Sequence, residues 1–149
     1  MNLNNIVKFI LEKQKYKLAI SLNATEDVSR NKIMPINKKW PIADIIEAGR
    51  EYSKIKNRQV MFEYVLLKGV NDSEENAYKL SKLLKGIPCK INLIPYNEGL
   101  SIYERPSNNS ISKFSEILYN NRDTYRVLVR WSKGQDINAG CGQLAAEKV

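Results

Sequence analysis

The sequence predicts an α/β fold in which about four mostly parallel strands alternate with helices, and three observations indicate it. Short apolar runs of strand length alternate with segments whose apolar residues follow helical spacing. No hairpin signal joins one run to the next. The strands start near residues 18, 60, 90 and 125, intervals of roughly 30 to 43 residues that suit βα units. Because four parallel strands are too few to close a barrel, we expect a half-barrel, part of a larger (β/α) barrel.

The first third of the chain predicts a helix, a strand and two more helices. Helical spacing of apolar residues, a strand-length apolar run, cap-like residues and a proline suited to the first helical position indicate these elements. In chain order they are Ile6, Phe9 and Ile10 (helix), Leu18–Leu22 (strand), Thr25–Asp27 (cap of a helix over Val28–Met34), and Pro41 with Ile42, Ile45 and Ile46 (helix).

The rest of the chain predicts three strands and two helices in alternation. The strands are rich in β-branched and aromatic residues, and each helix has an apolar face. In chain order the elements are Val60–Leu67 (strand), Asn71–Glu75 (cap of a helix that stops at Gly86), Cys89–Pro95 (strand), Ile111, Phe114, Ile117 and Leu118 (helix), and Tyr125–Arg130 (strand).

Composition narrows the possible functions. The 149 residues, 43% of them hydrophobic, suit one core, and we expect residues 1–130 to form the barrel part and 131–149 a tail. A net charge of +8 favours phosphate-rich partners, although a solvated basic surface is the alternative. No segment is long and apolar enough for a membrane span or signal peptide, so we expect a cytoplasmic protein. The absence of histidine excludes His-dependent nucleophiles and His metal sites in this chain.

Ligands of parallel α/β folds bind at the carboxyl ends of strands. Polar residues follow the predicted strands there, at Ser21–Asn23, Lys68–Asp72, Tyr96–Asn97 and Arg130–Gly134. Ser21 and Asn23 could instead cap the next helix, and Asn97 could form an Asx-turn.

Two single residues attract attention. Glu63 interrupts an apolar strand, and its carboxylate needs a partner if it faces a barrel interior; an exposed edge position is the alternative. Cys141 lies between two glycines, which would leave its thiol accessible, although an inert cysteine is the commoner case. The other cysteine, Cys89, lies in a predicted strand, and neither belongs to a CxxC pair.

Five sequence blocks together resemble the RlmN/Cfr family of radical SAM RNA methyltransferases. They occur in family order and cover nearly the whole chain. The blocks are Leu18–Leu22, Lys32–Lys39, Phe62–Asp72, Cys89–Asn97 and Cys141–Leu144.

The resemblance implies a function and a set of site residues. Family members methylate C2 of an adenosine in 23S rRNA, and commonly in tRNA, with a [4Fe-4S] cluster and two molecules of S-adenosylmethionine. The family's methyl-carrying cysteine matches Cys141, which would act as an S-methylcysteine intermediate. Its S-adenosylmethionine-binding positions match Ser21, Leu22, Asn23 and Asn97. The fold implied is the C-terminal half of a radical SAM barrel.

The chain also departs from the family pattern. Asn23 stands where the family usually has histidine, and the approach to Cys141 and the loop after Asn97 are altered. The CxxxCxxC cluster motif and the resolving cysteine of the family are absent.

Three hypotheses follow. The first is a C-terminal fragment that is inactive alone and works with a separately encoded N-terminal half. The second is a non-catalytic RNA-binding remnant or interaction module. The third is a thiol protein that uses Cys141 alone.

Overall fold

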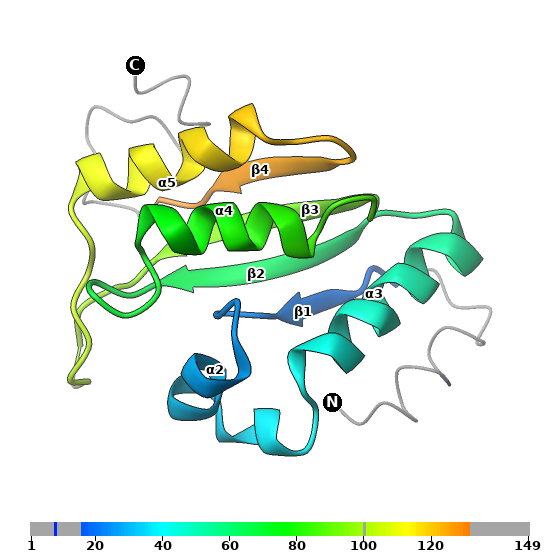
Figure 1. The fold of residues 1–149 in the computed structure, drawn as a ribbon, viewed down its shortest axis with the longest axis horizontal. Helices are drawn as coiled ribbons and strands as arrows, with labels where there is room; N and C mark the ends of the chain where they lie inside the picture. Colours follow the sequence, from blue (N-terminus) through cyan, green and yellow to red (C-terminus); the bar gives the residue numbers. More distant parts are fainter. Residues whose placement is uncertain (1–7, 9–15, 100, 132–149) are drawn as a thin grey trace.

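The computed structural model describes residue 8, residues 16–99 and residues 101–131, which contain one four-stranded sheet with helices along it (Figure 1). The strands lie in chain order and every neighbouring pair is parallel. This confirms the predicted α/β class and the alternation of strands with helices. The elements are β1 (Ala19–Ser21), α2 (Asp27–Ile33), the 3-10 helix η1 (Pro35–Lys38), α3 (Ile42–Lys56), β2 (Val60–Leu66), α4 (Glu74–Leu83), β3 (Cys89–Pro95), α5 (Asn108–Asn120) and β4 (Tyr125–Val129).

The two faces of the sheet differ in what covers them. Helices α3, α4 and α5 lie together on one side of it (Figure 1). On β2, alternate residues from Val60 to Leu66 are fully buried, whereas Met61, Glu63 and Val65 between them are only partly buried. Since successive side chains of a strand point to opposite faces, the second set lies on the face away from these helices. That face is the concave one in a β/α barrel.

The helix-covered face holds the hydrophobic core. The rings of Tyr64 and Phe114 lie 5.5 Å apart and join β2 to α5. Gly49 of α3 lies against the tip of the Phe62 ring, where a Cβ atom would be only 2.7 Å from Cζ. Burying each such aromatic side chain stabilises the fold by roughly 1.5–3 kcal/mol. The packing therefore fixes which face of the sheet the three helices cover.

Helix boundaries follow local signals, with small corrections to the predictions. Ser73 caps α4, because its hydroxyl accepts from the Asn76 amide in a capping box. Pro41 lies just before α3 and not at its first position. Asn57, with a φ of 50°, ends α3 in the left-handed conformation.

Two predictions lie outside the described residues, apart from Lys8, which is helical. They are the helix near residues 6–13 and the tail with Cys141, so the division at residue 130 stays a prediction. Among the described helices, none has the length and apolar character that a bilayer crossing requires.

Candidate functional site

The turn after β1 stays hydrogen-bonded to β2, first through the main chain of Leu22 and then through the side chain of Asn23. The amide of Leu22 donates to the Glu63 carbonyl oxygen at 2.9 Å. Asn23 then turns away with a left-handed φ of 58°, and its side-chain Oδ1 accepts from the Val65 amide at 2.8 Å. An asparagine tolerates this conformation better than most residues. The side chain of Asn23 thus replaces one rung of the ladder.

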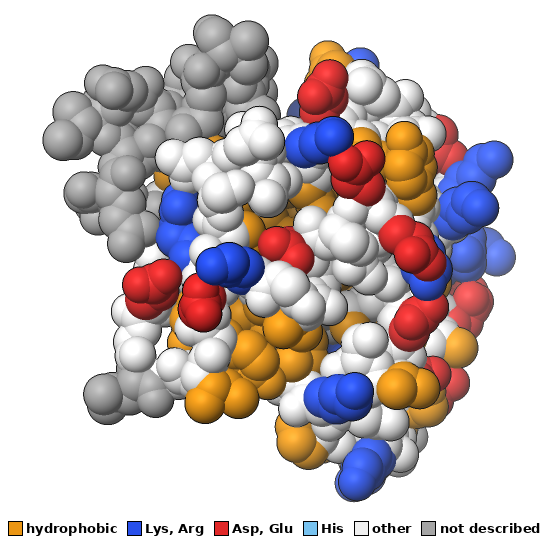
Figure 2. All heavy atoms as spheres, turned by 60° about the vertical axis from the view of Figure 1, so that its left-hand side comes forward, with side chains coloured by type: hydrophobic (Ala, Val, Ile, Leu, Met, Phe, Trp, Pro, Cys, Tyr) orange, Lys and Arg blue, Asp and Glu red, His pale blue; other side chains and the backbone are white. Residues whose placement is uncertain are grey.

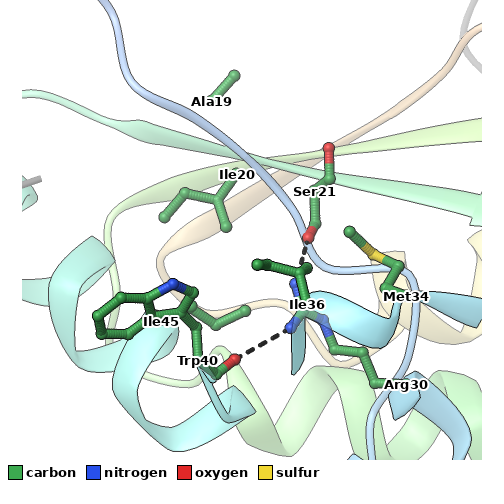
Figure 3. A pocket seen from close by; sticks show the side chains of 8 residues that line it. All are labelled: Ala19, Ile20, Ser21, Arg30, Met34, Ile36, Trp40 and Ile45. Atoms are coloured by element: carbon green, nitrogen blue, oxygen red, sulfur yellow. Dashed lines mark hydrogen bonds between the residues drawn. The ribbon is translucent and has the colours of Figure 1, made fainter. Parts of the chain in front are cut away.

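This geometry excludes the helix-capping alternative for Ser21 and Asn23. The residue that precedes α2 is Glu26, and it makes no side-chain cap. Leu22 is fully buried, so only its main chain could reach a ligand. Ser21 is exposed, and its hydroxyl points away from Arg30 (Figure 3).

Arg30, on α2, binds the main chain of the turn after β1. It is 3% exposed, and its guanidinium donates to the main-chain oxygen of Leu22 at 2.8 Å. It also donates to the main-chain oxygen of Ser21 at 2.9 Å (Figure 3). The same group donates to Asn37 Oδ1 and to the Trp40 carbonyl oxygen. Burial lowers the pKa of Arg30, which the charge of Asp27 opposes. Arginine keeps its charge even so, and the planar fork suits several fixed acceptors.

Asn71, in the loop after β2, holds the turn from the other side. Its Nδ2 donates to the carbonyl oxygens of Asn23 at 2.8 Å and Val65 at 2.7 Å, while its Oδ1 accepts from the Leu67 amide. Together, Arg30 and Asn71 bind three consecutive carbonyl oxygens, those of Ser21, Leu22 and Asn23. The sequence had indicated Asn71 as part of a helix cap and of the polar segment Lys68–Asp72 after a strand, but no local signal gave its partners.

A pocket of about 290 Å³ lies beside β1, between that strand and the segment from α2 to α3 (Figure 3). Its walls are mainly apolar. The residues that line it are Ala19, Ile20, Ser21, Arg30, Met34, Ile36, Trp40 and Ile45. Since β1 is the first strand of the described sheet, the pocket adjoins an open sheet edge.

Asn97, the fourth predicted site residue, follows β3 and lies at the same carboxyl edge as the turn after β1. The strand between them is β2, and the Tyr96 amide donates to the Leu66 carbonyl oxygen at 3.2 Å. The tertiary structure thus places Ser21–Asn23 and Asn97 at one edge of the sheet. Cys141 lies outside the described residues.

The described residues do not fit an iron–sulfur cluster. No group of three His, Cys, Asp or Glu side chains in residues 16–99 and 101–131 could hold a metal ion. The whole sequence has two cysteines, and Cys89 is buried in β3. Burial raises the pKa of its thiol to about 12, with the charge of Asp123 adding to the effect, so Cys89 is a poor metal ligand.

Comparison with known proteins gives close relatives over part of their length. The chain is 45% identical over 143 residues to the dual-specificity RNA methyltransferase RlmN of Anaeromyxobacter dehalogenans, which is 95% of this chain and 38% of that protein. It is 52% identical over 129 residues to the RlmN of Dinoroseobacter shibae, 85% of this chain and 32% of the relative. The chain therefore spans about a third of the length of these relatives. No family model matches.

Two solved structures share the fold. A radical SAM methyltransferase from Sphaerobacter thermophilus superimposes with a TM-score of 0.84 at 42% identity, over 97% of this chain and 42% of that one. A domain of pyruvate-formate lyase-activating enzyme from Bacteroides vulgatus gives a TM-score of 0.64 at 16% identity, covering 83% and 73% of the two chains, which is a likeness of fold alone. Both support a partial β/α barrel.

Proposed function

Because this chain belongs to the RlmN type of radical SAM methyltransferases, we propose that it is the C-terminal part of an enzyme that methylates adenine C2 in 23S rRNA and tRNA. One observation supports this assignment above the others. The positions that match the family's cofactor-binding residues, far apart in sequence, lie together at the carboxyl edge of the sheet.

S-adenosylmethionine would lie against this edge. The exposed Ser21, the main chain of Leu22 and Asn23, and Asn97 would hold it, while Arg30 and Asn71 keep the turn in place. The side chain of Asn23 already pairs with β2, so its contribution would come from its main chain. When bound, S-adenosylmethionine supplies the methyl group and the radical chemistry of the family.

The [4Fe-4S] cluster needs ligands from elsewhere. Two cysteines cannot supply the three thiolates of the family's cluster motif, and one of the two is buried. We therefore propose that the chain alone is inactive and acts with a region that contains the cluster ligands. The open edge of β1 and the apolar pocket beside it are where that region would pack.

Cys141 is the proposed methyl carrier. It matches the family position, both of its neighbours in sequence are glycines, and the buried Cys89 cannot substitute for it. The role in this chain is that of an S-methylcysteine intermediate that delivers carbon to the base.

Complementation tests this proposal. The chain is mixed with a separately expressed N-terminal half of an RlmN relative whose cluster has been reconstituted, and RNA is analysed for 2-methyladenosine. We expect product with the wild-type chain and with Cys89→Ala, and none with Cys141→Ala or with either half alone. If the two halves associate but form no 2-methyladenosine, the proposed activity is wrong.

A second candidate is a non-catalytic RNA-binding module, which the net charge of +8 favours. The face at the carboxyl ends of the strands, brought forward in Figure 2, shows Lys and Arg side chains interspersed with Asp and Glu. Lys68 pairs with Glu104, and Lys79 with Glu26 and Glu75. Salt-dependent binding of rRNA or tRNA that exceeds that of an unrelated protein of equal charge would support this candidate.

A further inference from the structure

Three polar side chains lie side by side on the concave face of the sheet. The parallel register pairs Ser21 of β1 with Glu63 of β2, and Glu63 with Asn92 of β3. All three belong to the set that points away from α3, α4 and α5. We call Ser21, Glu63 and Asn92 the polar row. Its neighbours in register along the strands are Met61, Val65, Lys90 and Ile94, and Leu128 follows Asn92 across the sheet.

Two members of the polar row lack a partner among the described residues. Asn92 is 3% exposed, yet its Nδ2 has no hydrogen-bond partner. Glu63 is half-buried on a central strand, and none of the ion pairs among the described residues includes it. A buried donor without an acceptor costs about 1–3 kcal/mol, and native proteins rarely keep one without a reason. This also settles the edge alternative for Glu63, because β2 lies between β1 and β3.

The chemistry of the row restricts the ligand. Neighbouring strands are about 4.8 Å apart, so a carboxylate and an amide on adjacent strands can converge on two neighbouring ligand atoms. The Glu63 carboxylate accepts hydrogen bonds only, whereas Asn92 Nδ2 donates. A vicinal diol satisfies both, since each hydroxyl donates and accepts, and a carboxylate is a common partner for ribose hydroxyls in nucleotide sites.

We propose that Glu63 and Asn92, beside Ser21, bind the ribose hydroxyls of a ribonucleoside on the concave face. The inference rests on the proposed function in one respect, because Ser21 matches a cofactor-binding position. Neither Glu63 nor Asn92 belongs to the set of positions matched to the family's cofactor site. The ribonucleoside is either that of S-adenosylmethionine or a nucleotide of the RNA substrate.

Nuclear magnetic resonance of the full chain tests this directly, because the Asn92 side-chain amide gives its own signals. The probes are adenosine, S-adenosylhomocysteine and 2′,3′-dideoxyadenosine. We expect adenosine and S-adenosylhomocysteine to shift the Asn92 side-chain signals and dideoxyadenosine to leave them unchanged. Shifts from S-adenosylhomocysteine with none from adenosine would indicate the cofactor as the source. The reverse would indicate the RNA nucleotide.

Substitution provides the second measurement. Glu63→Gln keeps the size of the side chain and removes the charge, so we expect at least a tenfold weaker affinity for adenosine with an unchanged melting temperature. Glu116→Gln, on the exposed side of α5, is the matched control and should bind as the wild type does. Asn92→Asp replaces the donor with a second acceptor and should weaken binding similarly.

Three results would overturn the inference. They are equal binding of dideoxyadenosine and adenosine, unchanged affinity in Glu63→Gln, or no response of Asn92 to any of the probes. The failure is separable from that of the proposed function, which depends on 2-methyladenosine formation in the complementation experiment. If binding depends on the diol but no 2-methyladenosine forms, the ribose-binding site is supported and the proposed methyltransferase activity is wrong.

Discussion

The side-chain amide of Asn71 donates a hydrogen bond to the main-chain oxygen of Asn23, 2.8 Å away, and joins the loop after β2 to the turn after β1. With Arg30 on the other side, it binds every carbonyl oxygen of Ser21–Asn23. A turn held in this way is already ordered before a ligand arrives. Less conformational entropy is then lost on binding.

Asn71→Ala tests the first half of this arrangement. The substitution leaves the Asn23 and Val65 carbonyl oxygens and the Leu67 amide without their partner. Because buried groups that lose a partner cost about 1–3 kcal/mol, we expect the free energy of unfolding in urea to fall by about 2 kcal/mol or more. Asn120→Ala, at the exposed end of α5, should change it by less than about 0.5 kcal/mol. Equal effects of the two substitutions would contradict the role given to Asn71.

Arg30→Lys tests the second half without removing the charge. A lysine ammonium cannot reproduce the fork that serves Leu22, Ser21 and Asn37 together. We expect the amide signals of Leu22 and Asn23 to shift and stability to fall by about 1–3 kcal/mol. Arg50→Lys, in an exposed pair with Glu47, is the control and should leave both unchanged. If the amide signals of Leu22 and Asn23 are unchanged in Arg30→Lys, a positive charge alone is sufficient to hold the turn.

Gly49→Ala tests the packing of α3 on the helix-covered face of the sheet. The new Cβ atom would lie 2.7 Å from Phe62 Cζ in a ring that is fully buried. Overpacking of this kind costs about 1–3 kcal/mol, and the better helix propensity of alanine returns up to about 1 kcal/mol. We expect a net loss in urea unfolding that Phe62→Leu partly relieves in the double variant. A stabilised Gly49→Ala protein would show that α3 can move away from β2.

The thiol of Cys89 should react slowly in the native protein and readily in the unfolded protein. With the pKa of its thiol raised to about 12 by burial, only about one molecule in 10⁴ has a thiolate there at pH 8. In a Cys141→Ser background we expect almost no reaction of the native protein with a thiol-specific reagent such as 5,5′-dithiobis(2-nitrobenzoate). One thiol per chain should react once the protein is unfolded in urea. Rapid reaction of the native Cys141→Ser protein would contradict the burial of Cys89.

The same thiol predicts a dependence of stability on alkaline pH. The unfolded thiol has a pKa near 8.5, below that of the folded state, so the neutral native thiol stabilises the fold below about pH 8.5. This contribution is lost as pH rises from about 8.5 toward 12, by up to about 1.4 kcal/mol per pH unit. The stability gap between the wild type and Cys89→Ala should therefore narrow between pH 9 and pH 10.5. A constant gap would show that the folded pKa is not raised.

Much of the fold could be predicted because the signals are local. The run Val60–Leu67 and the helical spacing of Ile42, Ile45 and Ile46 needed only neighbouring residues, and both elements lie within a residue or two of the prediction. Ser73 provides the cap expected within Asn71–Glu75, whereas the contacts of Asn71 with Asn23 and Val65 were not predicted. Its partners are distant in sequence, and no periodic pattern reports a contact of that kind.

The sequence by itself determined the α/β class, the alternation of strands and helices along the chain, and the likeness to radical SAM RNA methyltransferases. Apolar periodicity and motif order are properties of the sequence alone. Only the tertiary structure decided what Glu63, Asn92 and Arg30 do. Strand register brings Glu63 beside Ser21 and Asn92, on the face of the sheet away from α3, α4 and α5. Such neighbours are created by folding, since side chains from three strands become adjacent, and Arg30 reaches the turn after β1, only once the sheet has formed.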